Sequence, residues 1–221
     1  MTDQTANAYW RMGGITVPEV EDYLYAMLPA RDEVLAEMEA EASKNKVAIV
    51  GPAVARVLYQ LATISGAKKI FEMGSAIGYS TIWLARAAGP RAEVFYTDGN
   101  PENARRAKEY FRRAGVAGRI HVLVGDALQL LRKTPGKFDL IFNDVDKHQY
   151  PAVLRLAVPR IRRGGLFITD NTLWSGRVAR PGRDKYTRGI QRFNRMVYSS
   201  KRLFPVLIPL RDGVTVCRKI H

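Results

Sequence analysis

EMGSAIGYS, residues 72–80, joins the short apolar run 69–73 (KIFEM) to an apolar segment with helical spacing. Glycine lets the backbone turn sharply and lie against a ligand without a Cβ in the way, and the start of the following helix offers unpaired N–H groups. A strand, a glycine turn and a helix in this order are typical of an α/β domain that binds a nucleotide-like ligand at the end of its first strand. A purely structural glycine turn is the alternative.

Outward from this loop, short apolar runs alternate with turns and helical segments. The runs that predict strands are 69–73, 93–97, 120–124, 138–143 and 166–169. Strands that alternate with helices predict a parallel sheet with helices on both faces. Near the end of the chain, 206–210 and 214–218 flank Arg211-Asp212-Gly213, which predicts an antiparallel hairpin with a glycine-assisted turn.

The length and the N-terminal pattern predict how the rest of the chain is organised. Of the 221 residues, 47% are hydrophobic, which favours a single domain over 1–221. Helical apolar spacing over 17–46 is interrupted at Pro29, so we expect two N-terminal helices. Residues 1–46 are therefore predicted to be a helical extension of the domain.

Charge, hydrophobic segments and cysteine content indicate where the protein acts and which partners it can have. The formal net charge is +14, a field that attracts nucleic acid, anionic membranes or acidic small molecules, although a surface adapted to solubility or high temperature has the same charge. No apolar run approaches the roughly 18 residues that span a bilayer, and the N-terminus lacks a signal-peptide pattern, so we expect a cytoplasmic protein without a membrane partner. Cys217 is the only cysteine, which excludes an intrachain disulfide and a cysteine-based metal site.

The glycine spacing in the first loop bears on the ligand. Gly74 and Gly78 are four residues apart, and no third glycine stands at the helix start, so the loop does not match the dinucleotide fingerprint. A nicotinamide-dependent dehydrogenase is therefore disfavoured. Glu72, just before the turn, suits a ligand with a cationic amino-acid end better than one with two phosphates.

Acidic residues also follow the second and third predicted strands. Asp98, followed by Gly99, closes the second strand at a position where a carboxylate accepts hydrogen bonds from ribose hydroxyls, with turn and capping roles as the less favoured alternative. After the third strand, Gly125-Asp126-Ala127 would lie beside an adenine, and Asp126 could accept from the exocyclic amine. N-capping of the next helix is the competing role for Asp126.

The most informative polar residues follow the fourth and fifth predicted strands. Neighbouring parallel strands deliver their carboxyl ends to one crevice, so Asp144, Asp170 and Asn171 are expected to converge there. Three hard oxygen ligands suit Mg²⁺ or another divalent cation, with solvated turn residues as the alternative. An ammonium beside a dication is pushed toward its neutral form, so Lys147 is a candidate general base. A surface ion pair between Lys147 and Asp146 is the other possibility.

In chain order these motifs resemble one protein family. The stretch from about 47 to 219 is similar to the cation-dependent O-methyltransferases, which include the catechol and caffeoyl-CoA O-methyltransferases. The matching motifs are 72–80, Asp98, 125–127, 144–147, Gly164-Gly165, Asp170-Asn171, 173–176 and Asp212-Gly213. The resemblance implies a Rossmann-like class I methyltransferase fold, with a seven-stranded, mostly parallel sheet and an antiparallel C-terminal hairpin.

The resemblance also implies ligands and roles. S-adenosylmethionine is the implied cofactor, together with Mg²⁺ or another divalent cation, and the implied assembly is a homodimer. Asp144 and Lys147 are the implied catalytic residues, with Lys147 as the base. Asp144, Asp170 and Asn171 are the implied metal ligands. The implied cofactor contacts are Val50, Glu72, Gly74, Ser75, Gly78, Ser80, Asp98, Gly99, Gly125, Asp126, Ala127 and Asp144.

Two substrate classes fit this expectation. Residues 76–80 (AIGYS) have the same sequence as the corresponding motif in bacterial members of the family, including the tRNA wobble 5-hydroxyuridine methyltransferase. A catechol and a 5-hydroxyuracil ring both present two adjacent oxygens, so one metal site could chelate either of them. We expect O-methylation of a small molecule with a vicinal oxygen, and tRNA is the alternative substrate.

The charge distribution leaves that choice open. Arginines and lysines crowd the segment 177–195, which could hold RNA phosphates or the anionic tail of a small substrate, or could form a solvated face. A noncatalytic RNA-binding module would not need the set of carboxylates and lysine described above. Because that set is intact, the sequence favours an enzyme.

Overall fold

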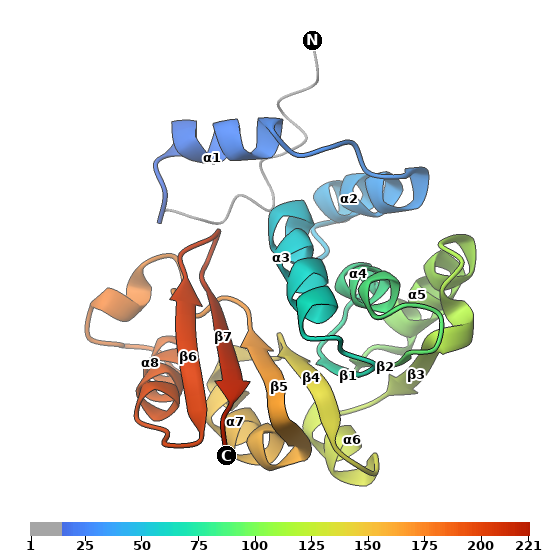
Figure 1. The fold of residues 1–221 in the computed structure, drawn as a ribbon. Helices are drawn as coiled ribbons and strands as arrows, with labels where there is room; N and C mark the ends of the chain where they lie inside the picture. The colour runs from blue at the N-terminus through green and yellow to red at the C-terminus, as the bar shows by residue number, and fades with distance from the viewer. Residues whose placement is uncertain (1–14) are drawn as a thin grey trace.

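A sheet of seven strands forms the centre of the structure, a computed structural model that describes residues 15–221. The strands are β1 (Lys69–Met73), β2 (Glu93–Asp98), β3 (Ile120–Val124), β4 (Phe138–Asn143), β5 (Ile161–Thr169), β6 (Leu203–Ile208) and β7 (Val214–Lys219). They lie in the order β3-β2-β1-β4-β5-β7-β6, and the first five are parallel (Figure 1). Strand β7 runs antiparallel to β5 and to β6. The predicted mostly parallel sheet with a C-terminal hairpin is therefore confirmed.

Helices cover both faces of this sheet (Figure 1). One layer holds α3 (Gly51–Ile64), α4 (Tyr79–Ala88) and α5 (Pro101–Arg113), and the other holds α6 (Ala127–Lys133), α7 (Tyr150–Arg160) and α8 (Lys185–Tyr198). Short 3-10 turns are η1 (Ala117–Arg119), η2 (Lys147–Gln149) and η3 (Arg177–Ala179). The buried apolar side chains form one core on each side of the sheet, with Val54 and Ile82 in the first and Leu128 and Val153 in the second.

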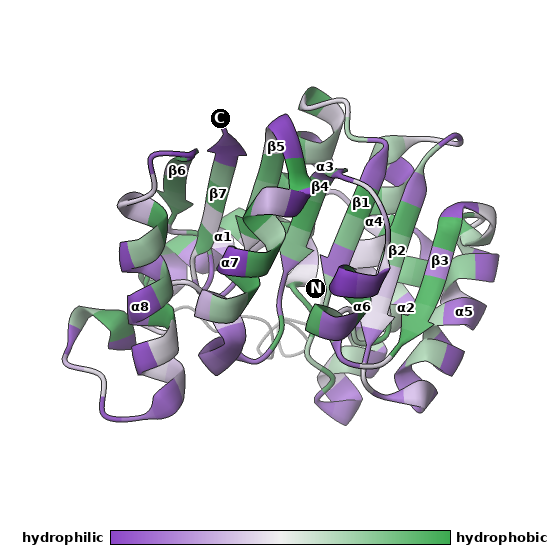
Figure 2. Ribbon diagram, turned by 90° about the horizontal axis from the view of Figure 1, so that it is seen from below, coloured by the Kyte–Doolittle hydropathy of each residue, from purple (hydrophilic) through white to green (hydrophobic). Residues whose placement is uncertain are grey.

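The sheet and its helices differ in hydropathy as this layering requires. Figure 2 shows mostly hydrophobic strands, whereas α5 and α8 mix hydrophilic and hydrophobic residues along their length. A helix with one apolar stripe packs that stripe on the sheet and leaves its charged face in water. The sequence pattern of alternating strands and amphipathic helices thus accounts for the three layers.

The N-terminal extension consists of two helices on the described residues, α1 (Pro18–Ala26) and α2 (Glu33–Asn45), as predicted. Asp32 caps α2 by accepting a hydrogen bond from the N–H of Leu35 at 3.3 Å. The first fourteen residues of the predicted extension lie outside the described range. Within that range, no helix is long and apolar enough to cross a membrane.

Two strands begin earlier than predicted. Strand β5 begins at Ile161 rather than Leu166, because the β4–β5 ladder shifts register between these two residues. A Cβ at Gly165, inside this irregularity, would lie 2.7 Å from the carbonyl oxygen of Asp139, so the apolar run is broken by a residue that must be small. Strand β6 begins at Leu203 and includes Pro205, which an edge strand tolerates.

Candidate active site

The loop between β1 and α4 is bent at two glycines. Gly74 has a φ of +82°, and Gly78, the N-cap of α4, has a φ of +86°. A Cβ would lie 2.7 Å from the carbonyl oxygen of Asp144 at the first position and 2.5 Å from the ring of Phe111 at the second. Only glycine fits both the backbone angle and the space. The loop after β1 therefore touches the backbone at the end of β4, and two of the predicted motifs meet at one point.

Asp98, at the end of β2, connects this loop to its neighbours. Its Oδ2 accepts a hydrogen bond from the N–H of Ala76 at 2.9 Å, and its Oδ1 accepts from the N–H of Asn100 at 2.8 Å. The N–H of Gly125 donates to the carbonyl oxygen of Asp98 at 2.9 Å. The ends of β1, β2 and β3 therefore meet at Asp98. Of the two alternative roles predicted for Asp98, it has the turn-stabilising one. It does not cap α5, because the N-cap of that helix is Asn100.

The other predicted cofactor residues lie around the same edge of the sheet. Asp126 caps α6 by accepting from the N–H of Gln129 at 2.8 Å, so the capping role is confirmed and the adenine contact stays a prediction. Gly99 is exposed, with open space where a Cβ would be. Val50 is buried at the start of α3, and Ser75 is buried in the glycine loop.

Glu72 is fully buried within the protein. Its two carboxylate oxygens accept hydrogen bonds from the hydroxyls of Ser80 and Thr81 in the first turn of α4. Burial raises the pKa of Glu72 to about 7, against the opposing effect of these hydroxyls. Both oxygens thus face α4 in this structure, and a contact with the cationic end of a ligand stays a prediction.

This buried carboxyl gives a prediction for stability against pH. Glu72 ionises near pH 4.5 in the unfolded chain and near about pH 7 in the folded protein, so the unfolded state loses its proton first as pH rises. The stabilising contribution is complete below pH 4.5 and is lost as pH rises through about 7. We expect Glu72→Gln to flatten the dependence of Tm on pH across this window, measured by thermal denaturation. Glu93→Gln, at the exposed start of β2, is the matched control, and a Glu72→Gln profile parallel to wild type contradicts the expectation.

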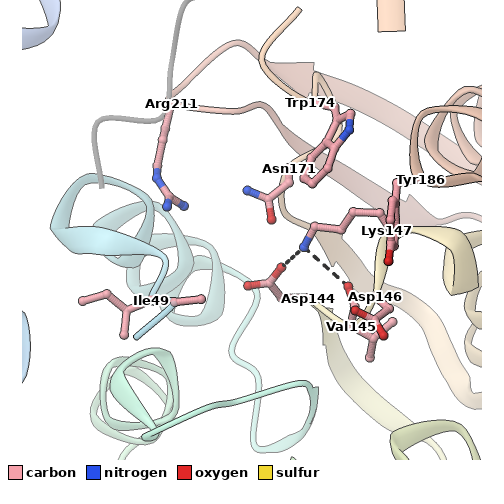
Figure 3. Close-up of a pocket in the computed structure, with 10 residues that line it drawn as sticks. Ile49, Asp144, Val145, Asp146, Lys147, Asn171, Trp174, Tyr186 and Arg211 are labelled. Carbon is pink, nitrogen blue, oxygen red and sulfur yellow. Dashed lines mark hydrogen bonds and ion pairs between the residues drawn. The ribbon is translucent and has the colours of Figure 1, made fainter. Parts of the chain in front are cut away.

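The ends of β4 and β5 open onto a cavity of about 470 Å³ (Figure 3). Asp144 and Asn171, two of the three residues that the strand-end argument predicts to converge, line it together with Lys147, whereas Asp170 is not among the lining residues. The ammonium of Lys147 donates to Oδ1 of Asp144 at 2.7 Å, so the ion-pair partner of Lys147 is Asp144 rather than Asp146. Asp170, the residue before Asn171, is fully buried.

The charges around this cavity are coupled. Burial alone would lower the pKa of Lys147, but attraction from Asp144, with smaller contributions from Tyr150 and Asp170, raises it above its ordinary value. Burial also raises the pKa of Asp170 to about 7, and the negative charge of Asp144 adds to this shift while Arg211 opposes it. The proton is therefore held on Lys147 in this structure. The predicted base can accept a proton only after its pairing with Asp144 changes.

The turn between β6 and β7 reaches into the same cavity. Arg211 lines it, has a φ of +53° and is only 6% exposed. Its Nη1 lies 3.3 Å from Oδ2 of Asp170. The sequence predicted only a hairpin turn here, because turn residues ordinarily face solvent and no spacing signal marks an inward-facing one. Tyr186 of α8, which also lines the cavity, was missed for the same lack of a motif.

Hydrogen bonds from this turn also fix the segment after β5. The carbonyl oxygen of Gly213 accepts from the N–H of Thr172 at 2.9 Å, and that of Asp212 accepts from the N–H of Leu173 at 2.9 Å. The carboxylate of Asp212 accepts from the N–H of Ser175. The segment that carries Asn171 is thus positioned by residues of the C-terminal hairpin.

The oxygen atoms of Asp144, Asp170 and Asn171 are of the kind that bind a hard divalent cation. Oδ1 of Asp170 is buried and has no hydrogen-bond partner among the described residues, a costly state for a carboxylate oxygen unless a ligand completes it. With Asp144 and Asn171 it offers carboxylate and amide oxygens, the ligands that Mg²⁺ prefers. No group of three or more His, Cys, Asp or Glu side chains in residues 15–221 could hold a metal ion, so the predicted set depends on the amide of Asn171.

Comparison with known proteins identifies the family. A family model described as O-methyltransferase matches residues 27–220. The chain belongs to the O-methyltransferase family. The catechol O-methyltransferase of Mycobacterium tuberculosis is 36% identical to it over 164 residues, which are 73% of this chain and 74% of that protein. The catechol O-methyltransferase of Niastella koreensis is 32% identical over 185 residues, which are 80% of this chain and 84% of that protein.

Solved structures agree with this assignment. An O-methyltransferase from Bacillus cereus in complex with S-adenosylhomocysteine has a TM-score of 0.82 and 30% identity, and the match covers 91% of this chain and 97% of that one. TomG from Streptomyces achromogenes, in complex with S-adenosylmethionine, has a TM-score of 0.83 and 27% identity over the whole of both chains. This O-methyltransferase is therefore an S-adenosylmethionine-dependent enzyme with the class I fold. The finding decides against the dehydrogenase and the noncatalytic module that the sequence left open.

Proposed function

We propose that this enzyme transfers the methyl group of S-adenosylmethionine to a hydroxyl with a vicinal oxygen on a catechol-type small molecule, with the help of a divalent cation. The observation that carries the proposal is the convergence of Asp144, Lys147 and Asn171 on one cavity. Trp174 and Tyr186 line the same cavity with ring centroids 6.5 Å apart, which suits a flat aromatic acceptor. Two relatives named catechol O-methyltransferase support this substrate class.

The side chains have distinct proposed roles. Asp144, Asp170 and Asn171 would hold the cation, which when bound would orient two vicinal oxygens and lower the pKa of the hydroxyl. Lys147 accepts the hydroxyl proton once its pairing with Asp144 is broken and its own proton has passed to solvent. The acceptor oxygen then forms the new C–O bond as the methyl C–S bond breaks, and S-adenosylhomocysteine leaves. Aligning the two reactants supplies much of the rate, because methyl transfer needs no covalent intermediate on the protein.

A labelling experiment tests the reaction and its substrate together. Methyl transfer from labelled S-adenosylmethionine is measured with Mg²⁺ or with a chelator, to caffeic acid and to tRNA that contains 5-hydroxyuridine. We expect labelling of the catechol that depends on Mg²⁺. Labelling that persists in chelator would contradict the cation, and labelling of neither acceptor would contradict the substrate class.

A second surface favours tRNA as the alternative substrate. A cavity of about 480 Å³ lies beside α8 and is lined by His148 and by cationic side chains of that helix. The cations are Lys185, Arg188, Arg192 and Arg195, and the part of the lining that the structure describes contains no carboxylate. If RNA phosphates bind there, methylation of tRNA should fall steeply with rising salt, whereas methylation of a neutral catechol should not.

Cofactor binding gives a further prediction. Asp98 connects the ends of three strands and carries the carboxylate proposed for the ribose hydroxyls. We expect Asp98→Asn to weaken S-adenosylhomocysteine binding by about tenfold, the loss of one charge-assisted hydrogen bond, with a much smaller change in kcat at saturating cofactor. Calorimetric titration with S-adenosylhomocysteine measures the first quantity. Unchanged affinity would remove Asp98 from the cofactor site.

We also propose that the enzyme is a homodimer. Four large apolar side chains in the described part of the N-terminal extension are exposed: Val17, Val20, Tyr23 and Met27. Exposed apolar patches of this kind often mark a protein contact surface. Light scattering of wild type and of a Tyr23→Ser, Met27→Ser double variant tests this, and a monomeric wild type contradicts it.

A further inference from the structure

We propose that Arg211 is a resident counter-ion of the cation site, so that a divalent cation binds Asp170 against the positive charge of the Arg211 guanidinium. The inference rests on the proposed role of Asp170 as a ligand. It goes beyond that role, because it concerns what sets the affinity of the site for the cation. The consequence is an enzyme that binds its cation more weakly than the same carboxylates would without Arg211.

The first observation is the ion pair itself. Nη1 of Arg211 lies 3.3 Å from Oδ2 of Asp170, and the two side chains are 6% and 0% exposed. Charges buried to this extent are poorly screened by solvent or salt and interact strongly. In Figure 3 the guanidinium points into the cavity, on the side where Asn171 and Asp144 lie. A cation that used both oxygens of Asp170 would therefore meet a positive charge already in place.

The second observation is the charge balance of the cavity. Asp144 and Asp170 each have a cationic partner, Lys147 and Arg211 respectively, while Asp146 also lines the cavity and Asp212 is buried next to Arg211. Arg211 therefore neutralises one of the carboxylates proposed as ligands, which reduces the negative charge that a dication would meet at Asp170. Removal of the guanidinium leaves one unbalanced carboxylate, which favours a bound cation.

The third observation is the backbone at this residue. Arg211 has a φ of +53°, a region that a residue with a side chain rarely adopts. The turn around it is fixed by hydrogen bonds from the N–H of Leu210 to Ile208 and from the N–H of Gly213 to Leu210, at 2.8 and 2.9 Å. A strained arginine whose charge is buried against a carboxylate points to a function for that charge. Glycine at this position would relieve the strain and remove the charge together.

Direct cation binding tests the proposal without any catalytic assay. Mn²⁺ is titrated into wild type, Arg211→Gly, Arg211→Met and Arg211→Lys, and bound Mn²⁺ is followed by electron paramagnetic resonance. The control is Arg163→Met, which removes an exposed arginine near the start of β5, roughly 20 Å along the strand from Asp170. We expect Arg211→Gly and Arg211→Met to bind Mn²⁺ at least about tenfold more tightly than wild type. Arg211→Lys and Arg163→Met should stay within about threefold of wild type, as they keep the local charge.

The outcomes separate this inference from the proposed function. Unchanged or weaker Mn²⁺ binding in both neutral variants, with S-adenosylhomocysteine binding intact as proof of folding, overturns the role of Arg211 and leaves the cation site standing. If Asp170→Asn also fails to reduce Mn²⁺ binding, the cation site itself is wrong. Tighter binding in Arg211→Gly and Arg211→Met that is abolished by adding Asp170→Asn supports the inference.

Discussion

The Asp144→Ala enzyme is expected to lose at least about a thousandfold in methyl-transfer rate with Mg²⁺ present, equivalent to about 4 kcal/mol of transition-state stabilisation. Asp144 is both a proposed cation ligand and the partner of Lys147 at 2.7 Å. Its removal takes away one oxygen ligand and leaves a largely buried ammonium without its carboxylate. Both changes act on the reacting hydroxyl, so the loss should appear in kcat, whereas the implied cofactor contact of Asp144 is measured separately by its affinity for S-adenosylhomocysteine.

Asp146 provides the matched control for this variant. It is an exposed carboxylate two residues further along that also lines the cavity, but Lys147 pairs with Asp144 instead. We expect Asp146→Ala to keep the methyl-transfer rate within about threefold of wild type, because an exposed charge contributes little. Titration with S-adenosylhomocysteine confirms that both variants still bind the cofactor product. An Asp144→Ala enzyme that methylates a catechol at the wild-type rate would show that the catalytic assignment is wrong.

The second large effect is expected from Gly74→Ala. A Cβ at this position would lie 2.7 Å from the carbonyl oxygen and 3.0 Å from the carbonyl carbon of Asp144, and the φ of +82° disfavours any side chain. The obstructing atoms belong to the backbone, so the loop or the end of β4 must move. We expect a loss of about 3 kcal/mol in the free energy of unfolding. We also expect S-adenosylhomocysteine binding to weaken by more than about tenfold, because the displaced loop is the proposed cofactor cradle.

Gly99→Ala is the control that distinguishes the effect of replacing any glycine in this region from the effect of a steric conflict with the backbone of Asp144. Gly99 lies at the same edge of the sheet, and a Cβ there would have no atom within 4 Å. Its free energy of unfolding should stay within about 0.5 kcal/mol of wild type in denaturant titrations. Equal losses in the two variants would mean that contact between the loop and β4 does not account for the role of Gly74.

Local sequence patterns predicted the strands where nothing interrupted the apolar run. The bounds predicted for β1, β3 and β4 are those observed, because each run is short, apolar and ended by a turn. The start of β5 was missed because the glycines of its irregularity break the run. The start of β6 was missed because Pro205 lies inside an edge strand, where a missing N–H is tolerated.

The site was predictable only so far as sheet topology determines it. Adjacent parallel strands must deliver Asp144 and Asn171 to one cavity, and they do. The direction in which a side chain faces is not determined by topology. The sequence pattern around Glu72 does not show whether its side chain faces a ligand or the hydroxyls of α4. The pattern around Arg211 is that of an ordinary turn, although its side chain faces Asp170. Such side chains are placed by contacts between distant parts of the chain, which one sequence does not display.

The dependence of the segment after β5 on the β6–β7 turn has a consequence for biosynthesis. The glycine loop, Asp98 and Gly125 assemble from strands made early in translation, whereas Thr172 and Leu173 acquire their hydrogen-bond partners only when residues 212–213 emerge. In a nascent chain, the ends of β1, β2 and β3 that form the proposed cofactor site can therefore fold before the acceptor cavity is complete. Pairings between residues far apart in sequence form slowly, so the step that completes the acceptor cavity is expected to be late in refolding as well. Competence to bind the methyl donor should then appear before competence to transfer the methyl group.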